Sequence, residues 1–317
     1  MADRAPVQDG RFIRLTREDK TVLTLLADEA WELHEGVRAF FYDSRRYTDP
    51  SMRVYLTANV RGREFRCVVS EHVEFWRRVI SGRWEPHTFA VIDRFVTEAS
   101  TYIDVGSWIG PTVLFAAQSA GRAFAFEPDP IAFSELAVNC EANRSLFPTL
   151  TLHNRAIAAH DGKVRVVSQG GGGDSKSSTL FSSGETSWDV EATTLETFLQ
   201  SVGAVERLFI KMDIEGGEYK LVPSLRRVLS YPNCSLLLSM HPFLLAKHLR
   251  SERLRRGLPA AGWAFRTFFL HVRLIWALSS KPLYLPTGER ISRLRLMLSP
   301  WIGQVLVTSE DWAPHTA

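Results

Sequence analysis

The chain has 317 residues, 45% of them hydrophobic and 23% charged, which is typical of a folded globular protein and excludes a largely disordered one. With 38 basic and 35 acidic residues, the formal charge of +3 is too small to indicate a nucleic-acid-binding protein. The three cysteines lie far apart without CxxC spacing, which argues against a disulfide framework or a cysteine zinc site and predicts a cytoplasmic protein.

Residues 1–85 are predicted to be an N-terminal extension of helical and hairpin character. The beginning of the chain is charged throughout and lacks the apolar core of a signal peptide. Residues 1–50 are expected to be helical, and residues 52–69 predict two strands joined by a turn at Arg61-Gly62. Residues 73–96 are predicted to be helical, with breaks at Gly82 and Pro86.

Residues 86–317 are predicted to form the main domain, because strands and helices alternate along them. The strands are short and apolar, which indicates an α/β fold with a Rossmann-like, mostly parallel seven-stranded sheet and helices on both faces. Residues 294–299 and 304–309 are expected to close the sheet as a final antiparallel hairpin. The five strands before them are expected at residues 101–106, 123–128, 149–154, 208–216 and 235–241.

Residues 245–290 interrupt the strand series and are predicted to be an insertion that caps the active site. One interpretation is a solvated, arginine-rich helix face followed by a packed helix. The other is a lid for an anionic or lipid-like substrate, or a surface that touches a membrane. The most apolar stretch, 263–278, contains Arg266, His271 and Arg273, so it is too short and too charged for a stable membrane span.

The strongest motif is an apolar strand that ends in Asp104, turns through Gly106 and enters a helix after Gly110. Glycine lets the backbone approach a ligand closely, and the start of a helix presents free N–H groups. Glu127 ends the next strand, where a carboxylate can accept both hydroxyls of an adenosine ribose. The alternative is a purely structural role, in which the tight turn binds no ligand and Glu127 is an acid at the start of a helix.

The residues of this turn favour S-adenosylmethionine over a dinucleotide. A dinucleotide site prefers G-x-G-x-x-G, whereas Trp108 occupies the position of the middle glycine. Asp104 would repel a pyrophosphate but suits the cationic amino group of a methionine moiety. An NAD-dependent oxidoreductase is therefore the weaker alternative.

Several segments resemble those of FkbM-type methyltransferases and occur in the same order. They are IDVGSWIG, FEPDP, NRAI, TLETF and above all KMDIEGGE, and the upstream GRWEPHTF is similar to the segment that leads into the first strand of that family. The resemblance covers residues 84–241. It implies a class I methyltransferase fold over the main domain and transfer of a methyl group, commonly to a hydroxyl.

By position in these motifs, the resemblance implies that Asp104, Gly106 and Gly110 hold the methionine part of the cofactor and that Glu127 holds the ribose. Ser107 is counted with them as a cofactor-binding residue. The family has Asn where this chain has Trp108, which affects any contact of that side chain but not the glycine turn.

Two further polar residues are predicted to lie near the adenine. Asp129 follows Glu127 by two residues and either reaches the adenine side or caps the next helix. Asn154 ends the third strand and lies either near the adenine edge or in an ordinary turn.

Lys211, Asp213 and Glu215 alternate along the fourth strand, so their side chains are expected on one side of it. Charged side chains on one side of a buried strand, at its carboxyl end, cost free energy unless they form ion pairs or bind a ligand. Asp213 is predicted near the transferring methyl or the acceptor hydroxyl, Glu215 as a substrate-orienting group and Lys211 as their ion-pair partner. The alternative is a structural ion-pair network. A divalent metal held by Asp213 and Glu215 is a further alternative, but no His or Asn is obvious as a third ligand, so no metal is predicted.

His241 ends the fifth strand at the same edge of the sheet and is predicted to be the general base that deprotonates the acceptor. Its alternative is a histidine that caps a strand end before Pro242. The chain shows no nucleophile-elbow or Cys–His signature, which agrees with a direct displacement without a covalent intermediate.

The sequence thus predicts an S-adenosylmethionine-dependent O-methyltransferase for a hydroxyl on a sugar, natural product or lipid-linked substrate. The second alternative is a degenerate methyltransferase fold that serves as a binding or scaffold protein. The expected partner is a small-molecule or lipid-linked hydroxyl substrate rather than nucleic acid, and a homo-oligomer is left open.

Overall fold

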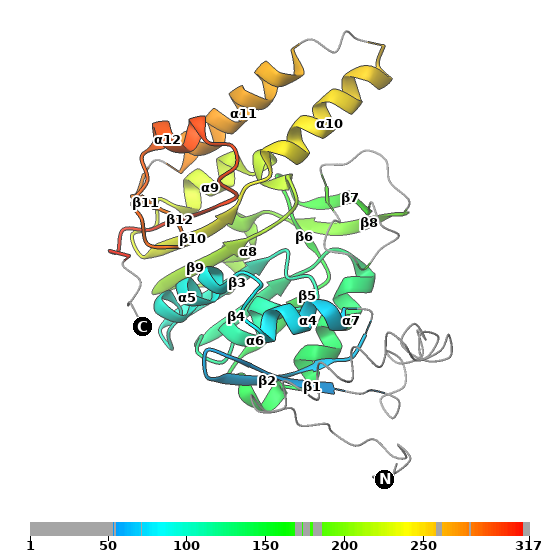
Figure 1. Cartoon of the computed structure of the whole chain (residues 1–317), viewed down its shortest axis with the longest axis vertical. Coiled ribbons are helices and arrows are strands. Elements are labelled where there is room, and N and C mark those ends of the chain that lie inside the picture. The colour runs from blue at the N-terminus through cyan, green and yellow to red at the C-terminus, as the bar shows by residue number, and fades with distance from the viewer. Residues whose placement is uncertain are drawn as a thin grey trace, which may run out of the picture. The chain divides into compact units, whose positions relative to one another are not determined.

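The computed structural model describes residues 53, 55–70, 72–168, 173, 178–179, 186–257, 262–278 and 280–312 (Figure 1). The chain divides into two compact units, Met1–Pro86 with Ser134–Leu146, and His87–Phe133 with Phe147–Ala317. The first unit therefore takes a segment that the sequence assigned to the main domain, and the proposed division at residues 85/86 stays a prediction. The helical character expected for residues 1–50 lies outside the described residues.

The first unit contains a β-hairpin that covers the predicted strand pair. Strands β1 (Tyr55–Val60) and β2 (Arg63–Val68) are antiparallel, and both turn residues have positive φ, as a two-residue hairpin turn requires. Side-chain amides satisfy the backbone of β2, since Asn139 Oδ1 accepts from the N–H of Val68 and Asn143 Oδ1 from that of Arg66, each at 2.7 Å. The unit also holds helix α4 (Val73–Ile80) and the 3₁₀ turn η3 (Arg144–Leu146).

The second unit is built on a seven-stranded sheet with the order β11-β12-β10-β9-β3-β4-β5. The strands β3, β4, β5, β9 and β10 are parallel, whereas β12 is antiparallel to both β10 and β11. A mostly parallel seven-stranded sheet with a final antiparallel pair is thus confirmed. The strand bounds are β3 Ser100–Val105, β4 Arg122–Phe126, β5 Leu150–His153, β9 Arg207–Met212, β10 Cys234–Ser239, β11 Leu283–Tyr284 and β12 Gln304–Val307.

The prediction that residues 294–299 form the first strand of this final hairpin was wrong. They belong to helix α12 (Arg293–Leu298), which begins where the Ser292 side chain accepts a hydrogen bond from the Arg295 N–H. Leucine, methionine and arginine are good helix formers, and the local cap decided between the two structures. The strand that pairs with β12 is the shorter β11 upstream.

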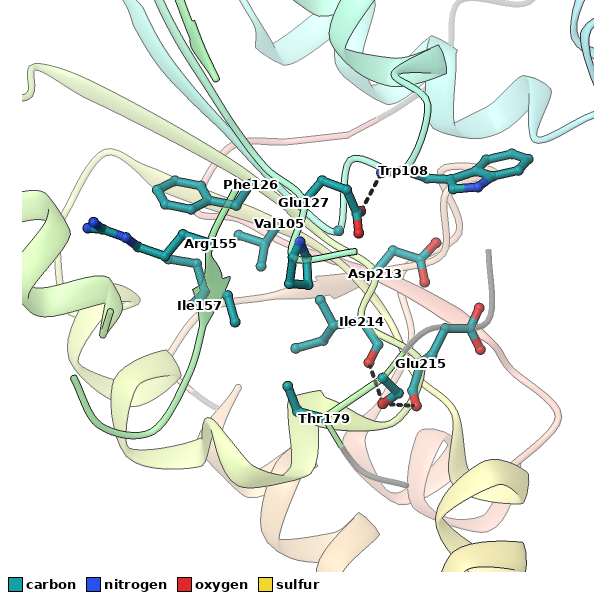
Figure 2. Close-up of a pocket in the computed structure, with 14 residues that line it drawn as sticks. Val105, Trp108, Phe126, Glu127, Arg155, Ile157, Thr179, Asp213, Ile214 and Glu215 are labelled. Carbon is teal, nitrogen blue, oxygen red and sulfur yellow. Dashed lines mark hydrogen bonds between the residues drawn. The ribbon is translucent and has the colours of Figure 1, made fainter. Parts of the chain in front are cut away.

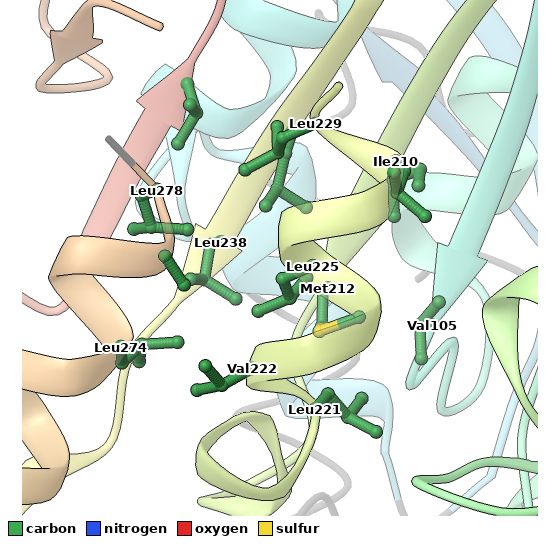
Figure 3. Packing of buried hydrophobic residues seen from close by; sticks show 14 of the residues in the cluster. Val105, Ile210, Met212, Leu221, Val222, Leu225, Leu229, Leu238, Leu274 and Leu278 are labelled. Atoms are coloured by element: carbon green, nitrogen blue, oxygen red, sulfur yellow. The ribbon is translucent and has the colours of Figure 1, made fainter. Parts of the chain in front are cut away.

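Helices cover both faces of the sheet, as predicted. Apolar faces of α8 (Leu195–Val202), α9 (Val222–Val228) and α11 (Trp263–Ala277) join one core with alternate residues of the strands. Figure 3 shows the part of this core between α9, α11 and the strands. On the other face, Phe95 of α5 (Pro86–Phe95) lies against Phe209 of β9. Further helical elements of the second unit are α6 Pro111–Ala116, η4 Gly217–Lys220 and α10 Pro242–Arg255, whereas α7 Pro130–Glu141 belongs mostly to the first unit.

A second, three-stranded sheet lies between β5 and α8 in the chain and was not predicted. It consists of β6 (Ala156–Ile157), β8 (Thr186–Thr193) and β7 (Gly162–Ser168), with β7 antiparallel to β8. Beyond β7, Ser178 pairs with Val167 through two backbone hydrogen bonds of 3.0 Å. This sheet therefore fixes the segment that carries Ser178 and Thr179.

Candidate active site

The sheet reverses its direction of growth between β3 and β9. From β3 the chain adds β4 and β5 on one side, then returns to add β9 and β10 on the other. The carboxyl ends of β3 and β9 are neighbours, with Val105 opposite Met212. Ligands of open α/β sheets bind in the crevice at such a reversal, so a ligand site is expected at this edge of the sheet.

Gly106 follows β3 at a point where only glycine fits. Its φ is +82°, and a Cβ atom on it would lie 1.8 Å from the backbone oxygen of Asp213. The turn after β3 and the turn after β9 therefore touch through their backbones. Gly110 has φ +98° at the N-terminus of α6, and Pro111 takes the first helical position, where it needs no N–H.

Glu127 ends β4 and is held from two sides by backbone donors. Its Oε2 accepts from the N–H of Trp108 and its Oε1 from that of Asp129, each at 2.8 Å. Burial raises the pKa of Glu127 to about 7 against the opposing effect of these hydrogen bonds. An ionised carboxylate has about four acceptor positions, so two backbone bonds leave capacity for ligand hydroxyls. Trp108 itself has φ +48°, a strained conformation for a bulky side chain.

A cavity lies beside Glu127 at this edge of the sheet (Figure 2). Its lining comes from the turns after β3 and β9, the end of β4, strand β6 and the segment after β7. The walls combine apolar side chains, carboxylates and one guanidinium. The lining residues are Val105, Gly106, Trp108, Phe126, Glu127, Pro128, Arg155, Ala156, Ile157, Ser178, Thr179, Asp213, Ile214 and Glu215.

Asp104 is fully buried and is not among the residues that line this cavity. Its Oδ2 accepts from the hydroxyls of Tyr102, at 2.7 Å, and Thr112, at 2.6 Å, while Oδ1 lies 3.5 Å from Lys211 Nζ. The predicted contact between Asp104 and a methionine group stays a prediction; in this structure the side chain is held by Tyr102, Thr112 and Lys211. Ser107 is also buried, and its hydroxyl donates to the backbone oxygen of Asp104 at 3.1 Å.

The two residues predicted near the adenine have structural partners. Asp129 Oδ1 accepts from the N–H groups of Ile131 and Ala132 and so caps α7, while Oδ2 accepts from the Gly173 N–H at 3.0 Å. Asn154 donates to the backbone oxygen of Glu127 at 2.9 Å. Both side chains thus support the loop that presents Glu127.

The charged residues after β9 do not continue the strand, contrary to the predicted alternation. Strand β9 ends at Met212, and Glu215 has φ +50°, which excludes an extended conformation. The expected side chains nevertheless gather. Lys211 Nζ lies 3.9 Å from Asp213 Oδ2 and donates to the Gly106 oxygen at 3.3 Å.

His241 joins these acids from the end of β10, as the N-cap residue of α10. Its Nε2 lies 3.5 Å from Asp213 Oδ1 and 3.9 Å from Glu215 Oε2. On the other side of the ring, Nδ1 lies 3.3 Å from Oε1 of Glu218, and the His241 backbone N–H donates to the same oxygen at 2.8 Å. Glu218 is fully buried, so it fixes the orientation of the ring.

The carboxylates around His241 control its protonation. Burial lowers the pKa of His241, but the hydrogen bond and charge of Glu218 and the charges of Asp213 and Glu215 outweigh it and raise the pKa to about 9. The ring is thus mainly protonated at neutral pH. In this state it balances part of the negative charge of the three acids.

The same cluster offers donor atoms of the types that bind divalent cations. One donor atom each from Asp213, Glu215 and His241 lies within 4.8 Å of the others. Tertiary structure thus supplies the third donor that the sequence did not reveal. Pairing of protonated His241 with the acids accounts for the same arrangement without a cation.

Several site residues were missed from the sequence. Glu218 is the last residue of the KMDIEGGE motif, and an acid directly after the pair Gly216-Gly217 was a usable signal. Arg155 lies in the NRAI segment, and its charge beside an apolar strand was a weaker one. Ser178 and Thr179 follow a glycine-rich stretch with no distinctive pattern, so nothing in the sequence identified them.

One comparison with known proteins, the scan against family models, agrees with the motifs. Residues 104–244 match the family model for the methyltransferase FkbM domain. Among solved structures, a crystal structure of the methyltransferase FkbM from Methylobacillus flagellatus KT is similar at 17% identity and a TM-score of 0.31. The match covers 53% of this chain and 44% of that one, so the chain spans less than half of that protein's length. No curated protein matches the chain.

Proposed function

We propose that the chain, whose residues 104–244 match the family model for the methyltransferase FkbM domain, transfers a methyl group from S-adenosylmethionine to a hydroxyl of a sugar, natural product or lipid-linked acceptor. The observation that carries the proposal is the placement of Glu127 and Gly106 on one cavity, with the acids Asp213 and Glu215 on its lining. S-adenosylmethionine, when bound, supplies a methyl group already activated by its sulfonium centre.

The cavity has features that suit an adenosine. Glu127 presents a carboxylate toward the space where the ribose hydroxyls would donate. Phe126, Ile157 and Ile214 contribute apolar walls, which suit a flat purine ring. The missing Cβ at Gly106 lets the Asp213 backbone pack against this turn, so that both Gly106 and Asp213 lie on the cavity lining.

Negative charge suits the cationic end of this cofactor. Asp213 and Glu215 line the cavity and would attract the sulfonium and amino groups. Asp104 would act indirectly as a positioning residue, because it holds Lys211, and Lys211 in turn contacts Asp213 and the Gly106 oxygen. Asp129, Ser107, Gly110 and Asn154 would support the turns that shape the cavity.

His241 is our proposed general base for the acceptor hydroxyl. Its Nε2 faces Asp213 and Glu215, and Glu218 orients the ring from Nδ1, which is the arrangement of a base held by a third group. His241 would take the hydroxyl proton on Nε2 as the acceptor oxygen gains the methyl group, and the electron pair of the broken carbon–sulfur bond would leave with S-adenosylhomocysteine. Because its pKa is about 9 in the free protein, only the minor neutral form can do so at neutral pH.

Calorimetric titration with S-adenosylmethionine and S-adenosylhomocysteine tests the cofactor. We expect binding by the wild type and a loss of about 1.5–3 kcal/mol in Glu127→Ala, the cost of removing charge-assisted hydrogen bonds. Glu191→Ala, which removes an exposed carboxylate of β8, is the matched control and should bind as the wild type does.

If neither adenosyl ligand binds the wild type, the scaffold interpretation replaces methyl transfer. If NADH binds and S-adenosylmethionine does not, an oxidoreductase replaces it. If Glu127→Ala and the wild type bind S-adenosylmethionine with equal affinity, the cofactor assignment stands but Glu127 does not bind the ribose.

A further inference from the structure

Helices α10 and α11 form a hairpin that projects from the sheet (Figure 1), and we name this pair the helical hairpin. Helix α11 is apolar on two opposite faces. Leu274, Ile275 and Leu278 point inward and are buried in the main core. The outward face carries an aromatic stripe whose members are each between 49% and 74% exposed, namely Phe265, Phe268, Phe269 and Trp276.

The spacing of the stripe places its members together. Residues three and four apart share one side of a helix, and Trp276 lies about three turns beyond Phe265. A surface helix normally turns polar groups outward, so large aromatics on its outer face indicate a surface that binds something.

The charge of the helical hairpin indicates the kind of partner. Its two helices carry six basic residues and one acid, a formal charge of +5, whereas the whole chain is only +3. The rest of the chain is therefore slightly acidic. The charged residues are Lys247, Arg250, Arg253, Arg255, Arg266, Arg273 and Glu252.

A hollow on the helical hairpin combines both properties. Lys247, Arg250 and Arg255 line it together with the apolar side chains of Leu254 and Trp263. Cationic groups beside an apolar wall match a phosphate group attached to a hydrocarbon chain. No helix among the described residues is long and apolar enough to cross a membrane, so a lipid would be met at the membrane surface.

We propose that the helical hairpin docks on an anionic lipid membrane, with the aromatic stripe in the interface and the basic side chains on the phosphates. The helical hairpin begins at the sheet edge that carries the candidate active site, because His241 is the N-cap residue of α10. Phe243, two residues further along the chain, is exposed. The docking surface is thus continuous with the site in the chain, although it is independent of methyl transfer.

Co-sedimentation with vesicles tests the docking, with the full chain as the protein. We expect binding to vesicles of phosphatidylcholine and phosphatidylglycerol in equal parts, little binding to phosphatidylcholine alone, and release by salt. Phe265→Ser/Phe269→Ser and, separately, Arg250→Glu/Arg266→Glu should each weaken binding about tenfold or more, because one removes apolar insertion and the other reverses charge.

The matched controls remove an exposed aromatic and reverse an exposed cation elsewhere, in Tyr231→Ser and Arg226→Glu, and should bind vesicles as the wild type does. Wild-type levels of binding by both hairpin variants would overturn the proposal. So would a dimer in sedimentation velocity that the stripe variant dissociates, because the stripe would then bind a second copy. Calorimetry with S-adenosylmethionine on the same variants should be unchanged, which separates a failure of docking from a failure of the proposed function.

Discussion

The two halves of the site are built by different means. The turn after β3, with Gly106 and Trp108, is set by backbone geometry, namely positive φ values and a direct approach to the turn after β9. The cluster of Asp213, Glu215, Glu218 and His241 is set by charge, since its three acids raise the pKa of the one imidazole. Shape therefore dominates where the cofactor would bind, and protonation dominates where the acceptor would react.

This difference predicts that the two halves respond to substitution separately. Changes at Gly106 should alter cofactor affinity, whereas changes at His241 or Glu218 should alter turnover and its pH dependence. The distinction would be wrong if Gly106→Ala changed turnover without changing cofactor affinity, or if His241→Ala changed cofactor affinity without changing turnover.

The largest effect is expected for Gly106→Ala. The added Cβ would overlap the Asp213 backbone oxygen, and neither backbone can shift without disturbing β3 or β9. We expect loss of detectable S-adenosylmethionine binding in calorimetry and a clear drop in melting temperature. Gly62→Ala is the control, because Gly62 has a similar φ of +85° but nothing within 4 Å of the added atom. That variant should show only the backbone cost of about 1–2 kcal/mol and normal cofactor binding. Equal behaviour of the two variants would show that the contact with Asp213 is unimportant.

His241→Ala should lower kcat by about 100-fold or more, the usual contribution of a positioned base, while S-adenosylmethionine affinity stays within a few-fold. The measurement is release of S-adenosylhomocysteine with an acceptor found by screening hydroxylated sugars and lipids. His160→Ala, which removes an exposed histidine outside the site, should keep wild-type turnover. Full activity of His241→Ala would assign the deprotonation to another group.

Cofactor affinity should rise by about tenfold between pH 6 and pH 8, because only ionised Glu127 accepts from both ribose hydroxyls. The sign follows from the pKa of Glu127, which burial raises to about 7, so that much of the carboxyl is neutral below that pH. Glu127→Gln, which does not ionise, should bind more weakly and show a flat pH profile in the same calorimetric assay. A wild-type profile without slope would contradict the ribose role.

The smallest effect is expected for Glu218→Gln. The wild-type kcat/KM should rise with pH through about 9, since the raised pKa of His241 keeps the base protonated below that value. Glutamine keeps an acceptor for the ring but removes one negative charge, so the midpoint should move to lower pH by about one unit. An unchanged midpoint together with reduced kcat would indicate that Glu218 only supports the fold around η4.

The sequence determined the architecture wherever a pattern was local and repeated. The alternation of apolar strands and helices predicted the mostly parallel sheet, and Arg61-Gly62 predicted its hairpin, because turn chemistry and burial periodicity act over a few residues. The same local reasoning failed for residues 294–299, where Leu and Arg fit either structure and the Ser292 cap decided it. The alternating polar and apolar residues of β7 and β8 carried a strand signal that was overlooked.

The sequence also placed Asp104, Glu127, Asp213 and His241 at strand ends that meet at one edge of the sheet. Only the tertiary structure decided where each side chain points. Asp104 turns inward to Tyr102, Thr112 and Lys211, whereas Glu127 lines the cavity, and Glu218 reaches His241 across 23 residues of chain. The physical reason is that burial and ion pairing depend on neighbours from distant segments. The order of residues establishes which groups reach the edge, but not which of them turns to the solvent, to the core or to one another.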